Sequence, residues 1–431
     1  MPRPGANGGP ASIDPLDVIK TTITVAGFVG AVLVGVYGYR KQRLVEGDGH
    51  RADVEQLAQR YTTAADQLGH EKAAVRLAGV YAMARLADDW GEQRQVCIDV
   101  LCAYLRMPYE PDTASEKHRE GERHVRLTTQ EVLFNHLRRN DVVEERQAWS
   151  DIDLNLRGAY LDGVDLSNGQ VRSLDMTRCH LFGQSNFDGL HVTRNASFGG
   201  ALFTEDTTFH DATFAEVASF SGAKFEEKAV FARVIFLGDA DFETAEFSGD
   251  CWFRDSIFHN RAVFSEAEFH GMADLADTSF LDDRMVLFNN IKWLGPTSFT
   301  NSHFEGILYI VNCEFAENCA FSNGQFCSSV SFDRSKFFGE AYFDDAEFKN
   351  VHFSDAQFAK TAHFKGVLVK NLAIFAGCEF EANLILNKSR FDAILNLSSS
   401  RLSVNFKLKI QGSSAARTSA AHLSAASHSR P

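Results

Sequence analysis

One spacing dominates the sequence between residues 156 and 402. Large apolar side chains recur every five or six residues, as at Leu156, Leu161 and Leu166, and later at Phe198 and Phe203. Of the 37 phenylalanines, all but five fall in this series, against only 9 Tyr and 4 Trp in the chain. The five exceptions are Phe28, Phe134, Phe182, Phe338 and Phe406. Such an excess of one aromatic residue indicates a single structural position that is used many times.

A second residue two positions before each large one is usually small. It is most often alanine, and cysteine takes the same position at Cys179, Cys251, Cys313, Cys319 and Cys378. A helix repeats every 3.6 residues and a strand every 2, so neither explains this period. The pattern predicts a square coil of four sides, in which each repeat forms one side and points its large and small residues inward. Successive coils would stack about 4.8 Å apart through parallel backbone hydrogen bonds.

The repeats resemble those of the pentapeptide-repeat family, whose motif is A(D/N)LxX. GAYLDGVDLSN (158–168) is similar to that motif, and SFSGAKFEEKAVF (219–231) is typical of its phenylalanine-rich form. The resemblance implies a mainly β protein with a right-handed quadrilateral parallel β-helix, which we assign to residues 151–410. Residues 60–111, placed after an apolar segment, also resemble a group of membrane-anchored actinobacterial pentapeptide-repeat proteins.

The rhythm predicts irregularities at three places. Phe280 and Phe288 are eight residues apart, which indicates a loop at 281–287. The steps from Phe348 to Phe353 and Phe358 are one residue short, which predicts a tighter coil. Residues 404–410 are expected to cap the last coil, because an open sheet edge invites pairing with another chain. Residues 411–431 have the composition of a disordered tail.

An apolar segment near the N-terminus predicts one transmembrane helix at residues 18–39, after a disordered stub at 1–17. Its uncharged part, 21–39, would span roughly 28 Å as a helix, close to the thickness of a bilayer core. A cleaved signal peptide fits less well, since no basic region precedes it. Arg40, Lys41 and Arg43 follow the segment, which places the N-terminus outside and the rest of the chain in the cytoplasm.

Gly27, Ala31 and Gly35 form a small-residue stripe on this predicted helix. Such a stripe allows two copies to pack closely as a homodimer. Small residues are also common in membrane helices that do not associate, and the sequence leaves both interpretations open.

Residues 50–140 lack the phenylalanine pattern and predict a small α-helical region. Segments 53–68, 71–89 and 92–106 have apolar residues at helical spacing. Thr128 and Glu131 match a capping box, which predicts a short fourth helix after a charged linker at 112–126. This region is expected to dock on the first coil, to cap it, or to mediate self-association.

No motif for catalysis or for a cofactor is present. The sequence contains no glycine-rich phosphate loop, no GxSxG and no HExxH, so we predict no enzyme, no cofactor and no metal. Eight histidines fall one residue from a large inward position, where the register points them to solvent. They are His180, His191, His210, His259, His270, His303, His352 and His363. Cys97 and Cys102 are interpreted as buried structural cysteines.

The charge of the chain is acidic and is concentrated in the repeats. The whole chain has a formal charge of −14, and residues 201–283 hold 18 acids against 5 bases, a net of −13. Direct nucleic-acid binding is therefore not expected. The candidate partner-binding surface consists of Glu226, Glu227, Asp239, Asp241, Glu243, Glu246 and Asp250.

These features predict a non-catalytic scaffold, held at the cell membrane by residues 18–39, that binds a protein partner through its acidic solenoid. The alternative is a DNA mimic that modulates DNA gyrase or another topoisomerase, as the resemblance implies for some members of the family. The charge density over residues 201–283 permits this alternative. A membrane anchor disfavours it, because the anchor would hold the protein away from most of the chromosome.

Overall fold

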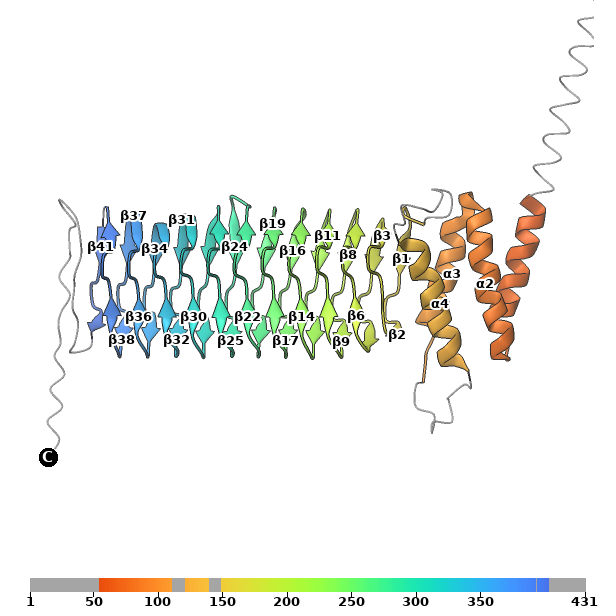
Figure 1. Ribbon diagram of the computed structural model, residues 1–431, viewed down its shortest axis with the longest axis horizontal. Coiled ribbons are helices and arrows are strands. Elements are labelled where there is room, and N and C mark those ends of the chain that lie inside the picture. The colour runs from red at the N-terminus through yellow and green to blue at the C-terminus, as the bar shows by residue number, and fades with distance from the viewer. Residues whose placement is uncertain (1–53, 111–120, 139–148, 393, 403–431) are drawn as a thin grey trace, which may run out of the picture. The chain divides into compact units, whose positions relative to one another are not determined.

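The computed structural model describes residues 54–110, 121–138, 149–392 and 394–402 (Figure 1). The predicted transmembrane segment with Gly27, Ala31 and Gly35 lies outside these residues, as do the stub, the cap at 404–410 and the tail. No helix among the described residues is long and apolar enough to cross a bilayer.

The repeats form a parallel β-solenoid with four sides (Figure 1). Each coil contributes one short strand to each side, and each strand pairs in parallel with its equivalent in the next coil. The predicted mainly β, parallel solenoid is therefore confirmed.

We number the sides 1 to 4 in the order in which the chain passes through them within one coil. Their strands have the following bounds. Side 1 contains β3 (Gln170–Val171), β7 (His191–Val192), β11 (Thr213–Phe214), β15 (Ile235–Phe236), β19 (Ile257–Phe258), β23 (Ser279–Phe280), β27 (His303–Phe304), β31 (Gln325–Ser331), β34 (Glu347–His352), β37 (Leu368–Ile374) and β40 (Arg390–Phe391). Side 2 contains β1 (Asp153–Asn155), β4 (Ser173–Asp175), β8 (Ala196–Ser197), β12 (Ala218–Ser219), β16 (Ala240–Asp241), β20 (Ala262–Val263), β24 (Met285–Leu287), β28 (Ile307–Tyr309), β41 (Ile394–Asn396) and the second halves of β31, β34 and β37.

The other two sides are formed by shorter strands alone. Side 3 contains β2 (Tyr160–Asp162), β5 (His180–Phe182), β9 (Leu202–Phe203), β13 (Lys224–Phe225), β17 (Glu246–Phe247), β21 (Glu268–Phe269), β25 (Lys292–Trp293), β29 (Glu314–Phe315), β32 (Lys336–Phe337), β35 (Gln357–Phe358), β38 (Glu379–Phe380) and β42 (Arg401–Leu402). Side 4 contains β6 (Ser185–Asn186), β10 (Thr207–Thr208), β14 (Ala229–Val230), β18 (Cys251–Trp252), β22 (Ala273–Asp274), β26 (Thr297–Ser298), β30 (Cys319–Ala320), β33 (Ala341–Tyr342), β36 (Ala362–His363) and β39 (Leu384–Ile385).

The large residues of the repeats fill the interior. Every phenylalanine of the series is at most 7% exposed, whereas Phe338, which lies outside the series, is 46% exposed. Rings one coil apart stack almost parallel, as for Phe220 and Phe242, whose centroids are 4.8 Å apart at 2°. Rings from sides 2 and 4 meet edge to face, as for Phe231 and Phe242 at 5.4 Å and 89°. Such pairs contribute about 0.5–1.5 kcal/mol each beyond burial.

The small residues also point inward, and most of the polar ones among them are hydrogen-bonded, although the hydroxyl of Ser185 is not. Ser335 donates its hydroxyl to the carbonyl of Ile310 at 2.7 Å, and Thr278 donates to Phe253 at 2.9 Å. The thiols of Cys313 and Cys378 donate to carbonyls in the same way. A buried hydroxyl or thiol costs little once it has such a partner, which explains why Ser, Thr and Cys replace alanine here.

The predicted irregularities are largely confirmed. The extra residues after Phe280 form a turn at 281–284, but the loop is shorter than expected because β24 starts at Met285 and pairs with β20 and β28. The shortened coil is present, since Phe332 stacks on Phe353 only 21 positions later. There the corner between sides 1 and 2 is replaced by continuous strands, with a register shift between β31 and β34.

The N-terminal region is helical, with one correction. Residues 54–68 are helical, followed by α2 (Ala73–Asp89), a 3₁₀ turn η1 (Gly91–Gln93), α3 (Arg94–Arg106) and α4 (Glu122–Leu137). The helix predicted at Thr128 instead begins at Glu122, so residues 122–126 are not linker. The charged residues that suggested a linker have partners: Glu122 bonds Arg76 and Tyr104, and Arg126 donates to carbonyls at the end of α3.

This helical region caps the first coil, which confirms one of the three predicted roles. Helix α3 packs on β1 and α4 packs on β2 (Figure 1). Gln95 of α3 donates to the carbonyl of Asp153 at 2.8 Å and accepts from its N–H at 2.9 Å. Gln130 of α4 makes the same two bonds with Asp162, both at 3.1 Å. Each glutamine amide thus replaces one residue of a neighbouring strand, which closes an otherwise exposed sheet edge on two sides.

Replacing an inward ring should cost far more stability than replacing an outward one. We expect Phe242→Ala to lower the free energy of unfolding by about 3–5 kcal/mol, because it leaves a cavity among stacked rings. The control Phe338→Ala removes a half-exposed ring and should cost less than about 0.5 kcal/mol. Equilibrium urea unfolding followed by circular dichroism measures both, and equal losses would contradict the inward register.

Removing the two glutamine amides should loosen the first coil. The double variant Gln95→Leu/Gln130→Leu leaves the N–H and C=O groups of Asp153 and Asp162 without their partners, at about 1–3 kcal/mol per buried group. Amide hydrogen exchange at residues 153 and 162 should then be faster than in the wild type. Gln93→Leu, at an exposed position of η1, is the matched control. Unchanged exchange in the double variant would show that the helices do not cap these strands.

Candidate interaction surface

The outward side chains are arranged in columns that run along the solenoid. Because coils pair in register, a surface residue lies beside the residue about 22 positions later. Side 3 carries a column of acidic and basic residues in which several neighbours of opposite sign pair. Lys224 pairs with Glu246 at 2.6 Å, Lys336 with Glu314 at 3.0 Å and Arg401 with Glu379 at 2.8 Å, and Lys292 pairs with Glu268. Exposed pairs of this kind contribute only about 0–1 kcal/mol, but they compensate part of the acidic charge.

The seven predicted acids do not lie on one face. Asp241 lies on side 2, with Asp239 and Glu243 at the corners before and after it. Glu226 and Glu246 belong to side 3, and Glu227 and Asp250 lie at the corner that follows. Residues close in sequence turn around the axis instead of running along it, so no single flat partner contacts all seven.

Several of these carboxylates have partners within the solenoid. Asp241 accepts from the backbone N–H of Glu243 at 3.0 Å, and Asp250 accepts from the N–H of Met272 in the next coil at 2.9 Å. Glu246 is paired with Lys224. These bonds satisfy backbone donors at the corners, a structural role that the sequence pattern did not reveal. They do not test the predicted role in partner binding.

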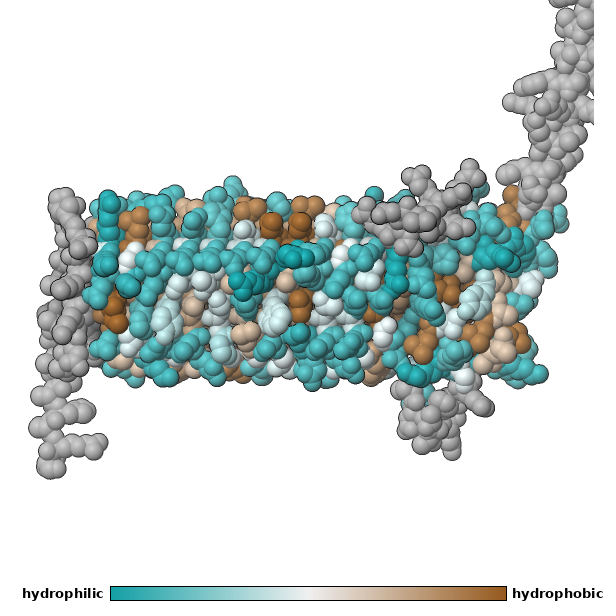
Figure 2. All heavy atoms as spheres, viewed as in Figure 1, coloured by the Kyte–Doolittle hydropathy of each residue, from teal (hydrophilic) through white to brown (hydrophobic). Residues whose placement is uncertain are grey.

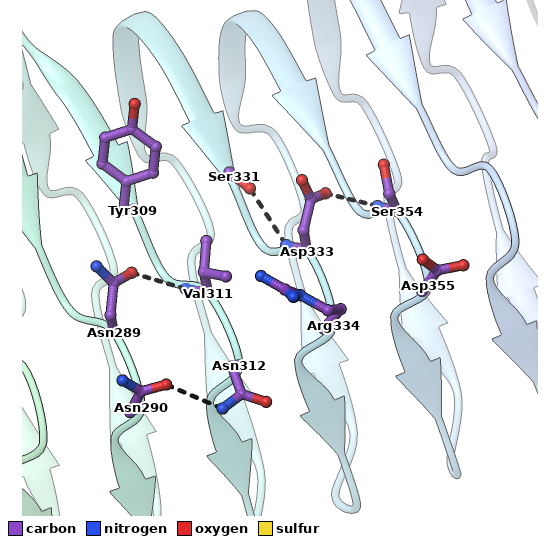
Figure 3. Close-up of a pocket in the computed structure, with 10 residues that line it drawn as sticks. All are labelled: Asn289, Asn290, Tyr309, Val311, Asn312, Ser331, Asp333, Arg334, Ser354 and Asp355. Atoms are coloured by element: carbon purple, nitrogen blue, oxygen red, sulfur yellow. Dashed lines mark hydrogen bonds between the residues drawn. The ribbon is translucent and has the colours of Figure 1, made fainter.

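A polar groove runs along the corner between sides 2 and 3 (Figure 3). Its volume is about 790 Å³, and it is lined by Asn289, Asn290, Tyr309, Val311, Asn312, Ser331, Asp333, Arg334, Ser354 and Asp355. Its polar groups largely bond one another: Asn312 donates to Asn290 at 2.9 Å and Asp333 accepts from the N–H of Ser354 at 2.7 Å (Figure 3). The carboxylate of Asp333 is thus engaged by the backbone of the next coil.

An apolar patch lies on side 1 and on the corner toward side 2. We define the side 1 patch as Val217, Ile235, Leu237, Ile257, Leu281 and Met285. Four of them are strongly exposed: Val217 at 44%, Leu237 at 41%, Met285 at 40% and Leu281 at 38%. Ile235 and Ile257 are directly paired between β15 and β19. In Figure 2, apolar side chains gather at the upper edge of the solenoid, where Figure 1 places β19 and β24.

Acidic residues border this patch. Glu216 precedes Val217, Asp239 follows Leu237 at the same corner, and Asp283 lies between Leu281 and Met285. Arg261 and Arg284 are the neighbouring bases, and Arg284 is paired with Asp282. An apolar centre within a charged rim is the usual composition of a protein-binding surface. Sequence reasoning missed the patch because its members come from four successive coils and become neighbours only when the coils stack.

The histidines and cysteines lie as the register predicts. None of the eight histidines of the series is buried. Seven of the eight cysteines are buried, and burial raises the pKa of the Cys179, Cys313 and Cys378 thiols to about 12. Such thiols stay protonated at neutral pH and are poor nucleophiles. Cys327 alone is exposed.

Comparison with known proteins identifies the repeat. A family profile described as pentapeptide repeats (9 copies) matches residues 198–246 and 325–368. No curated protein and no solved structure matches the chain. The comparisons therefore support the repeat family and not the narrower membrane-anchored group.

Both matched segments lie within the solenoid, and the unmatched coils between and around them continue the same inward series and strand pairing. On the shared repeat and the four-sided solenoid that it forms, the solenoid of this chain is a pentapeptide-repeat domain.

Proposed function

We propose that this protein is a non-catalytic scaffold, held at the cell membrane, whose solenoid binds a protein partner through the side 1 patch. The observation that carries the proposal is the cluster of exposed apolar side chains on successive coils of one side, four of which are at least 38% exposed. Leu237 and Leu281 lie two coils apart with His259 between them, and their backbones are fixed by inter-coil hydrogen bonds. A partner therefore meets a surface that is already ordered, which lowers the entropic cost of binding.

The rim indicates the chemistry of the partner. Glu216, Asp239 and Asp283 outnumber Arg261, which leaves the rim acidic once the Arg284–Asp282 pair is set aside. Residues 201–283, which contain the patch, carry a net charge of −13. The expected partner thus presents apolar side chains among basic ones. Asp239, one of the predicted partner-binding acids, adjoins this surface, while Glu226, Glu227 and Glu246 do not.

The membrane part of the proposal is supported by the sequence alone. The uncharged run at 21–39 is long enough to span a bilayer, and Arg40, Lys41 and Arg43 favour an orientation with the N-terminus outside and the solenoid in the cytoplasm. In this arrangement the anchor would hold the partner-binding rod at the inner face of the membrane.

The patch predicts a specific loss of binding. The double variant Leu237→Ser/Leu281→Ser removes two apolar contacts and should weaken partner binding on the order of tenfold or more. Its matched control is Met272→Ser/Leu294→Ser, which changes two residues of equal exposure, 36% and 40%, on side 3 and its corner. Affinity capture from native membranes with the wild type and with each double variant recovers the partner. Titration of the recovered partner against the three proteins then measures the change in affinity. Equal binding by the patch variant, or a loss in the control, would refute the patch as the contact.

The DNA-mimic alternative predicts a different result. A mimic should inhibit gyrase supercoiling at micromolar protein, whereas the scaffold should leave supercoiling unchanged. The charge distribution gives the alternative little support, because the acids are divided among sides and the side 3 column is paired with lysine and arginine. A supercoiling assay with the purified full chain distinguishes the two, and inhibition would replace the scaffold proposal.

A further inference from the structure

Three potential metal ligands of different chemistry meet on side 1, in the two coils that follow the side 1 patch. His303 and Glu305 alternate along the end of β27, so both point outward. Strand β31 pairs with β27 in the register His303 to Gln325 and Phe304 to Phe326, which places Cys327 beside Glu305. One ligand atom from each of the three residues, a ring nitrogen, a carboxylate oxygen and a sulfur, lies within 4.8 Å of the others.

The histidine is oriented for ligation by its neighbour in the next coil. Its Nδ1 lies 3.2 Å from Oε1 of Gln325, within hydrogen-bonding distance. The other ring nitrogen, Nε2, lies 3.4 Å from a carboxylate oxygen of Glu305. A metal ion placed there would have this ring nitrogen and this carboxylate oxygen as ligands. A second hydrogen bond that fixes the ring in this way is typical of metal-bound histidine.

Other outward histidines lack this combination. His270 and His363 also lie near a glutamate, at 3.6 and 3.5 Å, but no cysteine joins them. His259 lies in the same column as Glu305 but two coils before it, and its column neighbours are Leu237 and Leu281. Among the described residues, His303, Glu305 and Cys327 are the one group of three or more such side chains that brings its ligand atoms this close.

We propose that His303, Glu305 and Cys327 bind a transition-metal ion of the Zn²⁺ class. Nitrogen, oxygen and sulfur donors are the set that Zn²⁺ takes in proteins, at about 2.0–2.3 Å, and tetrahedral bonds of that length separate ligand atoms by roughly 3.4–3.7 Å. The three atoms need to approach by only about 1 Å, which side-chain rotation supplies. Water completes the fourth position, beside a hollow of about 260 Å³ that Cys327 lines together with Glu347 and Lys370.

The metal would link two successive coils. His303 and Glu305 belong to the coil of β27, and Cys327 belongs to the coil of β31. A ligand that binds only when both coils are in place stabilises the folded state. This role is independent of partner binding by the side 1 patch.

Co²⁺ is a suitable probe because a cysteine thiolate bound to it gives a sulfur-to-metal charge-transfer absorption. We expect chelator-treated full chain to bind one Co²⁺ with this absorption and to lose the signal when Zn²⁺ is added. Cys327→Ser should abolish the absorption, and His303→Ala should weaken Co²⁺ binding. Gln325→Leu, which removes only the bond to Nδ1, should weaken it by about 10- to 100-fold. His259→Asn, an exposed histidine of the same side, is the control and should change nothing.

Thermal unfolding gives an independent measurement of the stabilisation by the bound metal. Zn²⁺ should raise the unfolding midpoint of the wild type and of His259→Asn, and should leave that of Cys327→Ser unchanged. Because Cys327 is exposed, its serine variant is expected to fold normally, which circular dichroism verifies. Absence of the charge-transfer absorption in the wild type would overturn the proposal. Its persistence in Cys327→Ser, or equal Co²⁺ affinity in His303→Ala, would do so as well.

Discussion

The hydrogen bonds between successive coils set the distance at which the interior rings stack. Parallel strands lie about 4.8 Å apart, and this is also a favourable separation for offset aromatic rings. Phe242 lies 4.8 Å from both Phe220 and Phe264, with nearly parallel planes. The inter-coil hydrogen bonds and the stacked phenylalanine rings therefore favour the same spacing. Neither set of contacts has to be distorted to accommodate the other. This agreement explains why one residue type is repeated through so many coils.

A filled interior restricts function to the outside of the rod. The inward positions are occupied by rings, aliphatic chains and small residues, and inward hydroxyls such as those of Ser335 and Thr278 are bonded to backbone carbonyls. Recognition then depends on which side chains follow one another along a column. On side 3 acids of the column are paired with bases of the next coil, whereas on side 1 Ile235 and Ile257 follow one another. The two sides have the same backbone and different chemistry, which is why the patch is the better candidate for partner binding.

The first coil shows how the fold ends at its N-terminal edge. A strand there would expose unpaired N–H and C=O groups, which favour association with another chain. Gln95 and Gln130 supply an amide N–H and C=O to Asp153 and Asp162 in the place of a further coil. Buried Arg126 links the end of α3 to the same coil through the carbonyl of Tyr160. The helices are thus part of the solenoid's structure as well as a connection to the preceding residues.

The sequence by itself determined the inward register, the four-sided coil and the shortened turn near Phe353, because a period of five or six is a local property of the chain. It also identified the buried cysteines such as Cys313 from their place in that period. Only the tertiary structure decided which residues of different coils become neighbours. The fourth helix is an example: the sequence predicted its start at Thr128, whereas α4 begins at Glu122, which pairs with the distant residue Arg76. The dispersal of the seven acids, the side 1 patch and the meeting of His303, Glu305 and Cys327 all depend on the stacking of coils, whose neighbours lie about 22 residues apart in the chain.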